Sequence, residues 1–280
     1  MSSPARPVTR LDKSDVLDGL FSAWDALAEL VDGLTEEQWL AQTPLPGWQV
    51  RDVLAHIIGT ESMLRGMDSP EADVDVSTLK HVRNDVGVMN ERWVRRLRTV
   101  SFDELTQQFR ETTAARRAQL QTLRAVDWDA ITVTPAGPDS YGRFMRVRVF
   151  DCWMHEHDIR DALHRPAGDP ATTAARLALD EMAASMGFVV GKLGRAPDGS
   201  RVRLALTGPL RRTIKVAVDG RGRVVEEFDA EPTVTITLDG LLFTRLAGGR
   251  TAAARHADAI DVSGDEAVGR RIVDHLNYVI

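Results

Sequence analysis

The sequence predicts an α+β protein in which an N-terminal four-helix bundle precedes a smaller α+β domain with an antiparallel sheet. Up to about residue 190, apolar residues recur at three- and four-residue spacing, which is typical of amphipathic helices. After about residue 195, apolar and polar residues alternate, as they do in strands. Proline and glycine divide the helical part into segments long enough for four antiparallel core helices with a longer crossover loop. We therefore expect a bundle at 8–190 and a second domain at 195–280.

The first helix is expected to begin after Ser14 as its N-cap and to stop at Gly33. Thr35 and the Glu-Glu-Gln that follows it predict a capping box that opens a short helical turn. The Pro-Leu-Pro-Gly sequence at 44–47 then breaks the chain, because two prolines and a glycine do not continue a helix. Further helices are predicted at 48–66, 81–97, 101–123, 142–163 and from 169 onward, with loops at 68–75 and 134–141.

The second half carries three stretches with the two-residue period of half-buried strands. Asp219-Gly220 follows the second of them and is a hairpin signal. Two shorter helices are expected after the strands. The predicted strands are 201–207, 213–218 and 233–238, and the predicted helices are 241–247 and 265–276.

Composition excludes several classes of function. The 280 residues include 35 Lys and Arg against 41 Asp and Glu, so no basic excess is present to displace the counterions of a nucleic acid. The one cysteine excludes an intramolecular disulfide framework and a cysteine-based zinc finger. The sequence contains no uninterrupted run of about 18 apolar residues, so no membrane span is predicted. Residues 1–7 lack the apolar core of a secretory signal, so we expect a short flexible tail and a cytoplasmic protein.

Three residues form a candidate metal-binding set. Asp151 and His155 lie four residues apart in one predicted helix and therefore project from the same face, whereas His157 points to the opposite side. His56 lies within the apolar pattern of the helix at 48–66, which predicts that it faces the bundle interior. If the two helices are neighbours, His56, Asp151 and His155 supply two imidazoles and one carboxylate. Three protein ligands with one position left open suit a catalytic divalent metal.

Other interpretations of these residues are open at this stage. A histidine on an apolar helix face can be a hydrogen-bonded core residue, and Asp151 can form a structural salt bridge with Arg146 or Arg148. Asp52, one turn before His56, is either a solvated helix charge or a group that orients the imidazole.

Two further kinds of residue are assigned to the core. Cys152 lies between Phe150 and Trp153, and a thiol buried among apolar groups is usually inert, so we do not expect it to be the nucleophile. Trp48, Trp93 and Trp153 are likewise interpreted as core residues rather than as a platform for a cofactor. No catalytic residue beyond the metal centre is predicted.

Three segments resemble the mycothiol-dependent maleylpyruvate isomerase family, a group of DinB-like helical bundles. They are 43–59, which reads TPLPGWQVRDVLAHIIG; 81–93, which contains HVRNDVG and NERW; and 148–160, which reads RVFDCWMHEHDIR. The resemblance implies that a divalent metal, usually zinc, is bound by His56, Asp151 and His155. The family's well-known isomerase has glutamate where this chain has Asp151, and the missing methylene is expected to shorten the reach of the ligand and to retune or weaken metal binding. The chain after 195 resembles the family's C-terminal domain.

The resemblance also implies a chemistry. Metal coordination deprotonates a thiol and makes it a nucleophile. The thiol would be mycothiol, the small thiol of actinobacteria, and its thiolate would attack a small electrophilic substrate. The expected function is therefore that of a mycothiol-dependent isomerase, or of a transferase that stops at the adduct. The alternative is a non-catalytic protein on the same fold that binds a small ligand or serves as a scaffold.

Overall fold

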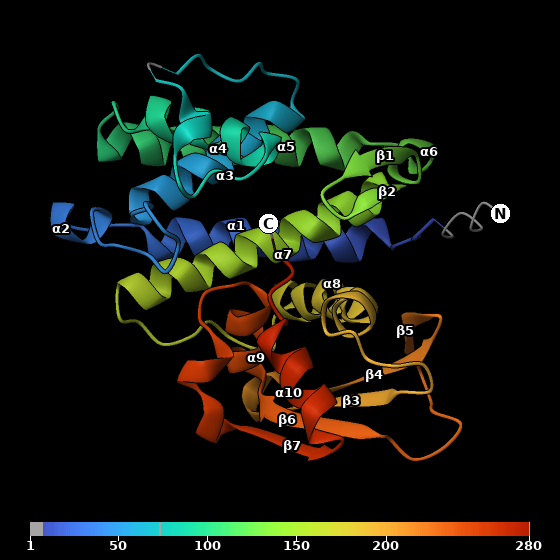
Figure 1. The fold of residues 1–280 in the computed structure, drawn as a ribbon. Helices are drawn as coiled ribbons and strands as arrows, with labels where there is room; N and C mark the ends of the chain where they lie inside the picture. The colour runs from blue at the N-terminus through green and yellow to red at the C-terminus, as the bar shows by residue number, and fades with distance from the viewer. Residues whose placement is uncertain (1–7, 73, 280) are drawn as a thin grey trace. The chain divides into compact units, whose positions relative to one another are not determined.

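In the computed structural model, residues 8–72 and 74–279 are described, and the predicted tail at 1–7 lies outside them. The chain forms two compact units that divide between Ala178 and Leu179, inside the helix α8 (Thr173–Phe188). This division lies earlier in the chain than the boundary expected at 190–195. Figure 1 labels the elements of both units.

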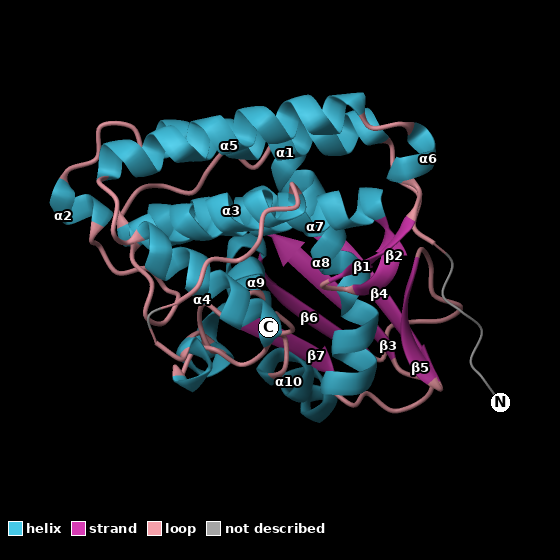
Figure 2. Cartoon of the chain, turned by 90° about the horizontal axis from the view of Figure 1, so that it is seen from above, coloured by secondary structure: helices cyan, strands magenta, loops and turns pink. Residues whose placement is uncertain are grey.

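Four long helices form the framework of the first unit. α1 packs against α5 and α7, and α3 packs against the same two helices. Figure 2 shows α5 and α3 running side by side. Buried apolar residues from all four helices, among them Leu20, Leu54, Leu105 and Val149, fill the space between them. The predicted helical bundle is thus confirmed. The helices are α1 (Lys13–Leu30), α3 (Val50–Leu64), α5 (Phe102–Thr122) and α7 (Tyr141–Ala162).

Shorter elements join these helices. α4 packs against α3, and the Thr35–Gln38 capping box opens α2 as the sequence predicted. A segment missed in the sequence, α6, follows α5. The shorter elements are α2 (Glu36–Trp39), a 3₁₀ turn (Val76–Thr78), α4 (Asp85–Leu97) and α6 (Ala125–Trp128).

Three predicted helix starts were wrong, each by a few residues. α1 is capped by Asp12, whose carboxylate accepts from the Asp15 amide at 2.9 Å, and the Ser14 hydroxyl donates to the same carboxylate. α4 begins after Asn84, whose side chain accepts from the Gly87 amide, rather than at 81. α8 begins at 173 rather than 169. In each case several polar residues precede the helix, and sequence does not reveal which of them caps it.

The loop predicted at 134–141 is a hairpin instead. β1 (Ile131–Thr134) pairs with β2 (Gly137–Ser140) in antiparallel register. Its second strand reads Gly-Pro-Asp-Ser, which has low strand propensity, so no strand pattern marks this segment. The hairpin is held by side chains: the Thr134 hydroxyl donates to the Gly137 carbonyl at 2.6 Å, and the Asp139 carboxylate accepts from the Ser140 amide.

Asp139 provides a pH-dependent contribution to stability. Its buried carboxylate accepts from the Thr9 amide and hydroxyl at 2.7 and 2.9 Å and from Arg143 at 2.8 Å. Burial alone would raise the pKa of Asp139, but these hydrogen bonds outweigh it and lower the pKa to about 2. Because the folded-state pKa lies below the unfolded value, the contribution is present above pH ~4 and is lost as the pH falls towards 2.

We expect Asp139→Asn to lower the free energy of unfolding by about 2 kcal/mol at neutral pH. Urea unfolding of both proteins between pH 6 and pH 2 checks this. The difference should shrink as the pH falls below about 4, and a difference that is constant across this range would contradict the assignment.

The second unit contains a five-stranded sheet in the order β5-β4-β3-β6-β7. The three predicted strands and the hairpin at Gly220 are confirmed, and β5 and β7 were missed. β3 and β6 pair in parallel, whereas the other neighbours are antiparallel, so the sheet is mixed rather than wholly antiparallel. α10 packs on β6 and β7. The elements are β3 (Arg201–Thr207), β4 (Arg212–Asp219), β5 (Arg221–Val225), β6 (Val234–Asp239), α9 (Gly240–Ala247), β7 (Ile260–Gly264) and α10 (Glu266–Asp274).

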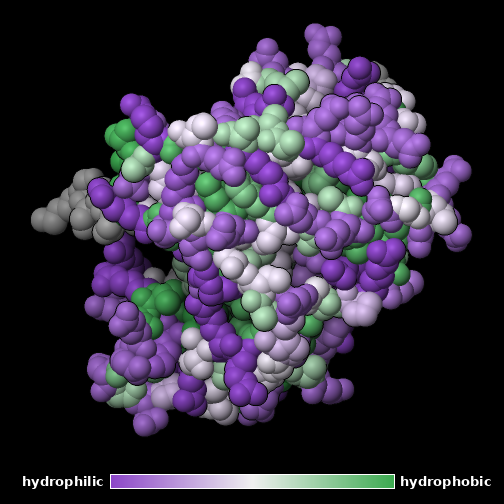
Figure 3. Space-filling model, turned by 180° about the vertical axis from the view of Figure 1, so that it is seen from behind, coloured by the Kyte–Doolittle hydropathy of each residue, from purple (hydrophilic) through white to green (hydrophobic). Residues whose placement is uncertain are grey.

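The surface seen in Figure 3 is mainly hydrophilic, with apolar side chains scattered among the polar ones. Exposed large apolar side chains include Val126, Ile131 and Val133. Of the helices in the described ranges, none has both the length and the apolar character that crossing a membrane requires.

Candidate metal centre

His56 reaches the bundle interior because of its position on α3. Its neighbours Val53, Leu54 and Ile57 are fully buried, so the helix face that carries them also carries the imidazole inward. The His56 Nε2 atom lies 3.1 Å from Asp151 Oδ2 on α7. The predicted packing of these two helices therefore brings residues 95 positions apart into contact.

Asp151 and His155 lie one turn apart on α7, as their spacing predicted. The His155 Nε2 atom is 3.5 Å from Asp151 Oδ1. One candidate ligand atom from each of His56, Asp151 and His155 can be chosen so that all lie within 4.8 Å of one another. The imidazole side chains are 7% exposed, whereas that of Asp151 is 29% exposed. The cluster is therefore closed on the imidazole side and accessible from the side of the carboxylate.

The two imidazoles are oriented in different ways. The His155 Nδ1 atom lies 2.9 Å from Asp158 Oδ2, which favours a proton on Nδ1 and leaves the Nε2 lone pair directed at the cluster. The His56 Nδ1 atom is buried and has no hydrogen-bond partner among the residues that the structure describes. The Trp48 indole packs against the His56 ring instead, with ring centroids 5.3 Å apart.

A chain of buried charges supports Asp151. Arg148 pairs with Asp151 through Oδ2 and with Glu61 at 2.9 Å, and Glu61 accepts from Arg116 at 2.9 Å. Glu61 and Arg116 are fully buried. The salt bridge between Asp151 and Arg148 considered from the sequence is therefore present together with the histidine contacts. The two interpretations of Asp151 do not exclude each other.

These surroundings set the protonation of the cluster. Burial alone would raise the pKa of Asp151, but Arg148 and the two imidazoles hold it well below its usual value. Burial lowers the pKa of His56 and outweighs the attraction of Asp151. For His155 burial acts in the same direction, but the carboxylates of Asp151 and Asp158 outweigh it and raise the pKa. At neutral pH the cluster thus offers an ionised carboxylate and a neutral His56.

This donor set fits a zinc ion or a related transition metal. Imidazole nitrogen with one carboxylate suits such metals, whereas calcium and magnesium prefer oxygen ligands throughout. Bonds of about 2.0–2.2 Å to a tetrahedral ion separate the ligand atoms by about 3.3 Å. Asp151 Oδ2 lies 3.1 Å from His56 Nε2, Asp151 Oδ1 lies 3.5 Å from His155 Nε2, and one ligand atom from each residue lies within 4.8 Å of the others. The shorter side chain of Asp151 therefore still reaches both histidines.

Comparison with known proteins decides the family. Residues 20–160 match the model of the mycothiol maleylpyruvate isomerase N-terminal domain, and residues 176–271 match the model of the C-terminal domain of the same family. The chain belongs to the mycothiol maleylpyruvate isomerase family. All three residues of the candidate centre lie inside the first match.

Individual relatives are more distant. Two uncharacterized proteins of Mycobacterium tuberculosis are each 25% identical over 190 residues, which is 66% of this chain and 70% of theirs. A crystal structure of the mycothiol-dependent maleylpyruvate isomerase superposes with a TM-score of 0.59 over 90% of this chain and 93% of the other, at 15% identity. A histidine-to-alanine mutant of that isomerase gives 0.56 over the same shares. At this identity the structural matches establish the fold alone.

Cys152 has neither the exposure nor the low pKa of a nucleophilic cysteine. It is fully buried, and burial raises the pKa of its thiol to about 12. We expect the folded protein to leave this thiol unmodified by a disulfide reagent at pH 8 and the unfolded protein to expose one thiol per chain. Rapid labelling of the native protein would contradict this assignment.

Two expectations about nearby residues were wrong. Asp52 is fully buried rather than solvated, and it pairs with Arg98 at 2.8 Å and accepts from the Gln49 amide instead of contacting His56. It therefore stabilises the N-terminus of α3. Trp48 is only half-buried and packs against both histidines of the centre, so it is not an ordinary core residue.

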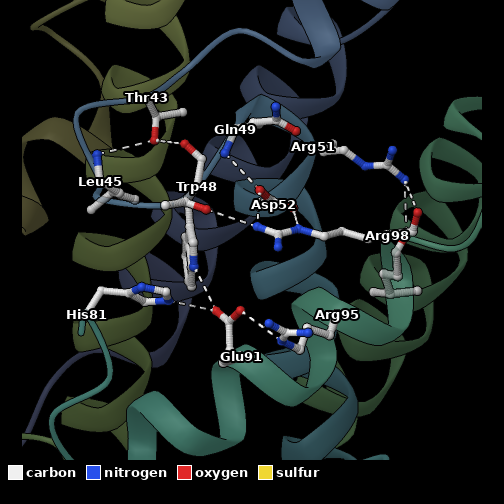
Figure 4. Close-up of polar contacts among 12 residues, drawn as sticks. Thr43, Leu45, Trp48, Gln49, Arg51, Asp52, His81, Glu91, Arg95 and Arg98 are labelled. Atoms are coloured by element: carbon white, nitrogen blue, oxygen red, sulfur yellow. Dashed lines mark hydrogen bonds and ion pairs between the residues drawn. The ribbon is translucent and has the colours of Figure 1, made fainter. Parts of the chain in front are cut away.

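The sequence also gave no role to Glu91, which lies beneath Trp48. Its buried carboxylate accepts from Trp48 Nε1 at 3.2 Å and lies 3.1 Å from His81 Nε2. Arg95 pairs with the other carboxylate oxygen at 3.5 Å. Figure 4 shows these side chains converging on Glu91. Their sequence signals were the family-like segments at 43–59, which contains Trp48, and at 81–93, which contains His81 and Glu91. Arg95 lies outside both segments.

Proposed function

We propose that this protein is a metal-dependent enzyme that uses a low-molecular-weight thiol to isomerise or conjugate a small electrophilic substrate. The observation that supports it is the convergence of His56, Asp151 and His155 on an accessible point in a member of the mycothiol maleylpyruvate isomerase family. These three residues would hold the metal, and zinc fits the donor set best. Mycothiol is the proposed thiol because the family is named for it.

A divalent ion bound there lowers the pKa of a coordinating thiol, so that the thiol is deprotonated at neutral pH. Asp151 needs no proton removed before it can serve as a ligand, because Arg148 keeps its pKa low. Asp158 fixes the Nδ1 side of His155 and leaves Nε2 for the ion. The exposed side of Asp151 provides the approach for thiol and substrate.

Isomerisation needs no covalent bond to a protein side chain. Addition of the thiolate to one carbon of a double bond, with a proton taken up elsewhere in the adduct, leaves a single bond about which the substrate can rotate. Loss of the proton and the thiolate then restores the double bond in the other geometry. A transferase would stop after the addition. The contribution of the chain is to position the thiol and the substrate for this addition.

The test has two steps. Protein purified without chelator should contain about one divalent ion per chain by elemental analysis. With mycothiol, maleylpyruvate should then be converted in a metal-dependent reaction, without net loss of thiol for an isomerase and with loss of one thiol per substrate for a transferase. Protein free of metal that retains a tightly bound organic ligand would instead support the non-catalytic alternative and contradict the proposal.

A further inference from the structure

The family-like segments at 43–59 and 81–93 meet at Glu91, outside the proposed ligand set. The Glu91 carboxylate holds the Trp48 indole and the His81 ring together. Gly47 makes this approach possible: its φ is +81°, and a Cβ atom there would lie 3.2 Å from the His81 ring. We call Trp48, His81, Glu91 and Arg95 the tryptophan clamp (Figure 4).

The main chain of Trp48 is fixed as firmly as its indole. Its carbonyl accepts from the Thr43 amide at 3.0 Å and from the Thr43 hydroxyl at 2.8 Å. Its amide donates to the Leu45 carbonyl at 3.1 Å, and the Gly47 carbonyl next to it accepts from Arg98. The loop before α3 therefore holds the indole at both ends, so its position does not depend on a bound ligand.

The indole lies against both imidazoles of the metal centre. Its centroid is 5.3 Å from that of His56 and 6.3 Å from that of His155, and the planes are tilted by 40° and 37°. A histidine that binds a metal usually donates its second ring nitrogen to a fixed acceptor, which sets the orientation of the ring. His155 has such an acceptor in Asp158, but His56 has none among the described residues. For His56, packing against the indole therefore has to set the ring orientation that the hydrogen bond to Asp158 sets for His155.

We propose that Trp48 is a positioning residue of the metal centre, and that the tryptophan clamp holds the indole so that the His56 ring presents Nε2 to the ion. This inference rests on the proposed metal centre. It gives the second family-like segment a role, because that segment supplies His81 and Glu91. It also predicts that the aromatic ring at position 48 sets most of the affinity for the metal, and that its hydrogen bond to Glu91 adds a smaller part.

The experiment measures the affinity for Zn²⁺ by competition with a chromophoric chelator in three variants. Trp48→Ala removes the ring and should weaken binding about 10- to 100-fold, the usual cost of losing a group that orients a ligand. Trp48→Phe keeps an aromatic face without the N–H and should stay within about threefold of the wild type. The absorption spectrum of bound Co²⁺ should change in Trp48→Ala and be preserved in Trp48→Phe, because it reports ligand geometry.

Trp39→Ala is the matched control. Trp39 is also a tryptophan of the first unit, and it stacks on Phe102 at 5.4 Å rather than on the histidines. It should lower the thermal unfolding midpoint and leave the Zn²⁺ affinity unchanged. Circular dichroism establishes that each variant is folded.

The outcomes separate the two proposals. A wild-type chain that binds no ion overturns the metal centre and the positioning role together. Wild-type affinity in folded Trp48→Ala, or equal losses in Trp48→Ala and Trp39→Ala, overturns only the role of Trp48. A selective loss in Trp48→Ala that Trp48→Phe restores supports it.

Discussion

Replacement of His155 with alanine is expected to weaken binding of a divalent ion by more than about 100-fold. The variant leaves only His56 and Asp151 as ligands, and the loss of a group that merely orients a ligand already costs about 10–100-fold. Titration with Zn²⁺ and elemental analysis of the purified variant measure the effect. The helical signal should be retained, because α7 is held by its packing on α1 and α3.

His157→Ala provides the control for this prediction. His157 lies on the same helix, is buried to a similar extent, and places its Nδ1 atom 2.9 Å from the Trp153 carbonyl rather than in the cluster. It should cost stability and leave metal content at about one ion per chain. If both variants retain the metal, or if both lose it to the same extent, the ion does not bind where we propose.

The convergence of His56, Asp151 and His155 could be predicted from the sequence because each residue obeys a local rule. Four-residue spacing fixes the relation of Asp151 to His155, and the apolar pattern around His56 fixes the direction in which it faces. The packing of α3 on α7 was the one assumption that spacing could not supply. The family-like segments supplied it, and the 3.1 Å separation of His56 and Asp151 agrees with it.

The surroundings of the donor set could not be predicted, because they depend on contacts between distant positions. Glu61 and Arg148 are 87 residues apart, and nothing in either helix alone indicates that a buried glutamate accepts from two arginines. Trp48 and Glu91 meet only because α4 packs against α3. The hairpin at 131–140 was missed because only its first strand, Ile-Thr-Val-Thr, has strand propensity, whereas the second depends on pairing with the first and on side-chain contacts.

Arg148 affects the proposed metal centre in two opposite ways. Its guanidinium keeps Asp151 ionised, but it pairs with the same carboxylate oxygen that faces His56. A bound cation would lie beside this positive charge and would compete with it for the carboxylate. Fold stability and metal affinity therefore place opposite demands on this residue.

Arg148→Met should accordingly lower the free energy of unfolding by about 3–5 kcal/mol and raise the Zn²⁺ affinity of the folded chain on the order of tenfold. Stability falls because one partner of a buried charge chain is removed and Glu61 is left with Arg116 alone. Affinity rises because the carboxylate of Asp151 loses its competing partner and the ion loses a repulsive neighbour. Urea unfolding without metal measures the change in stability. Competition with a chelator, without denaturant and well below the thermal unfolding midpoint, measures the change in Zn²⁺ affinity.

Arg143→Met separates the local electrostatic effect from general destabilisation. Arg143 is also a buried arginine of α7, and it pairs with Asp139 at 2.8 Å, away from the cluster. Its loss should destabilise the bundle by a similar amount and leave Zn²⁺ affinity unchanged. If Arg148→Met instead weakens binding while Arg143→Met does not, the guanidinium acts by holding the Asp151 carboxylate in place, and its positioning effect exceeds its repulsion of the ion. Opposite changes in stability and affinity, confined to Arg148→Met, would establish that the buried charge chain stabilises the fold at the expense of metal affinity.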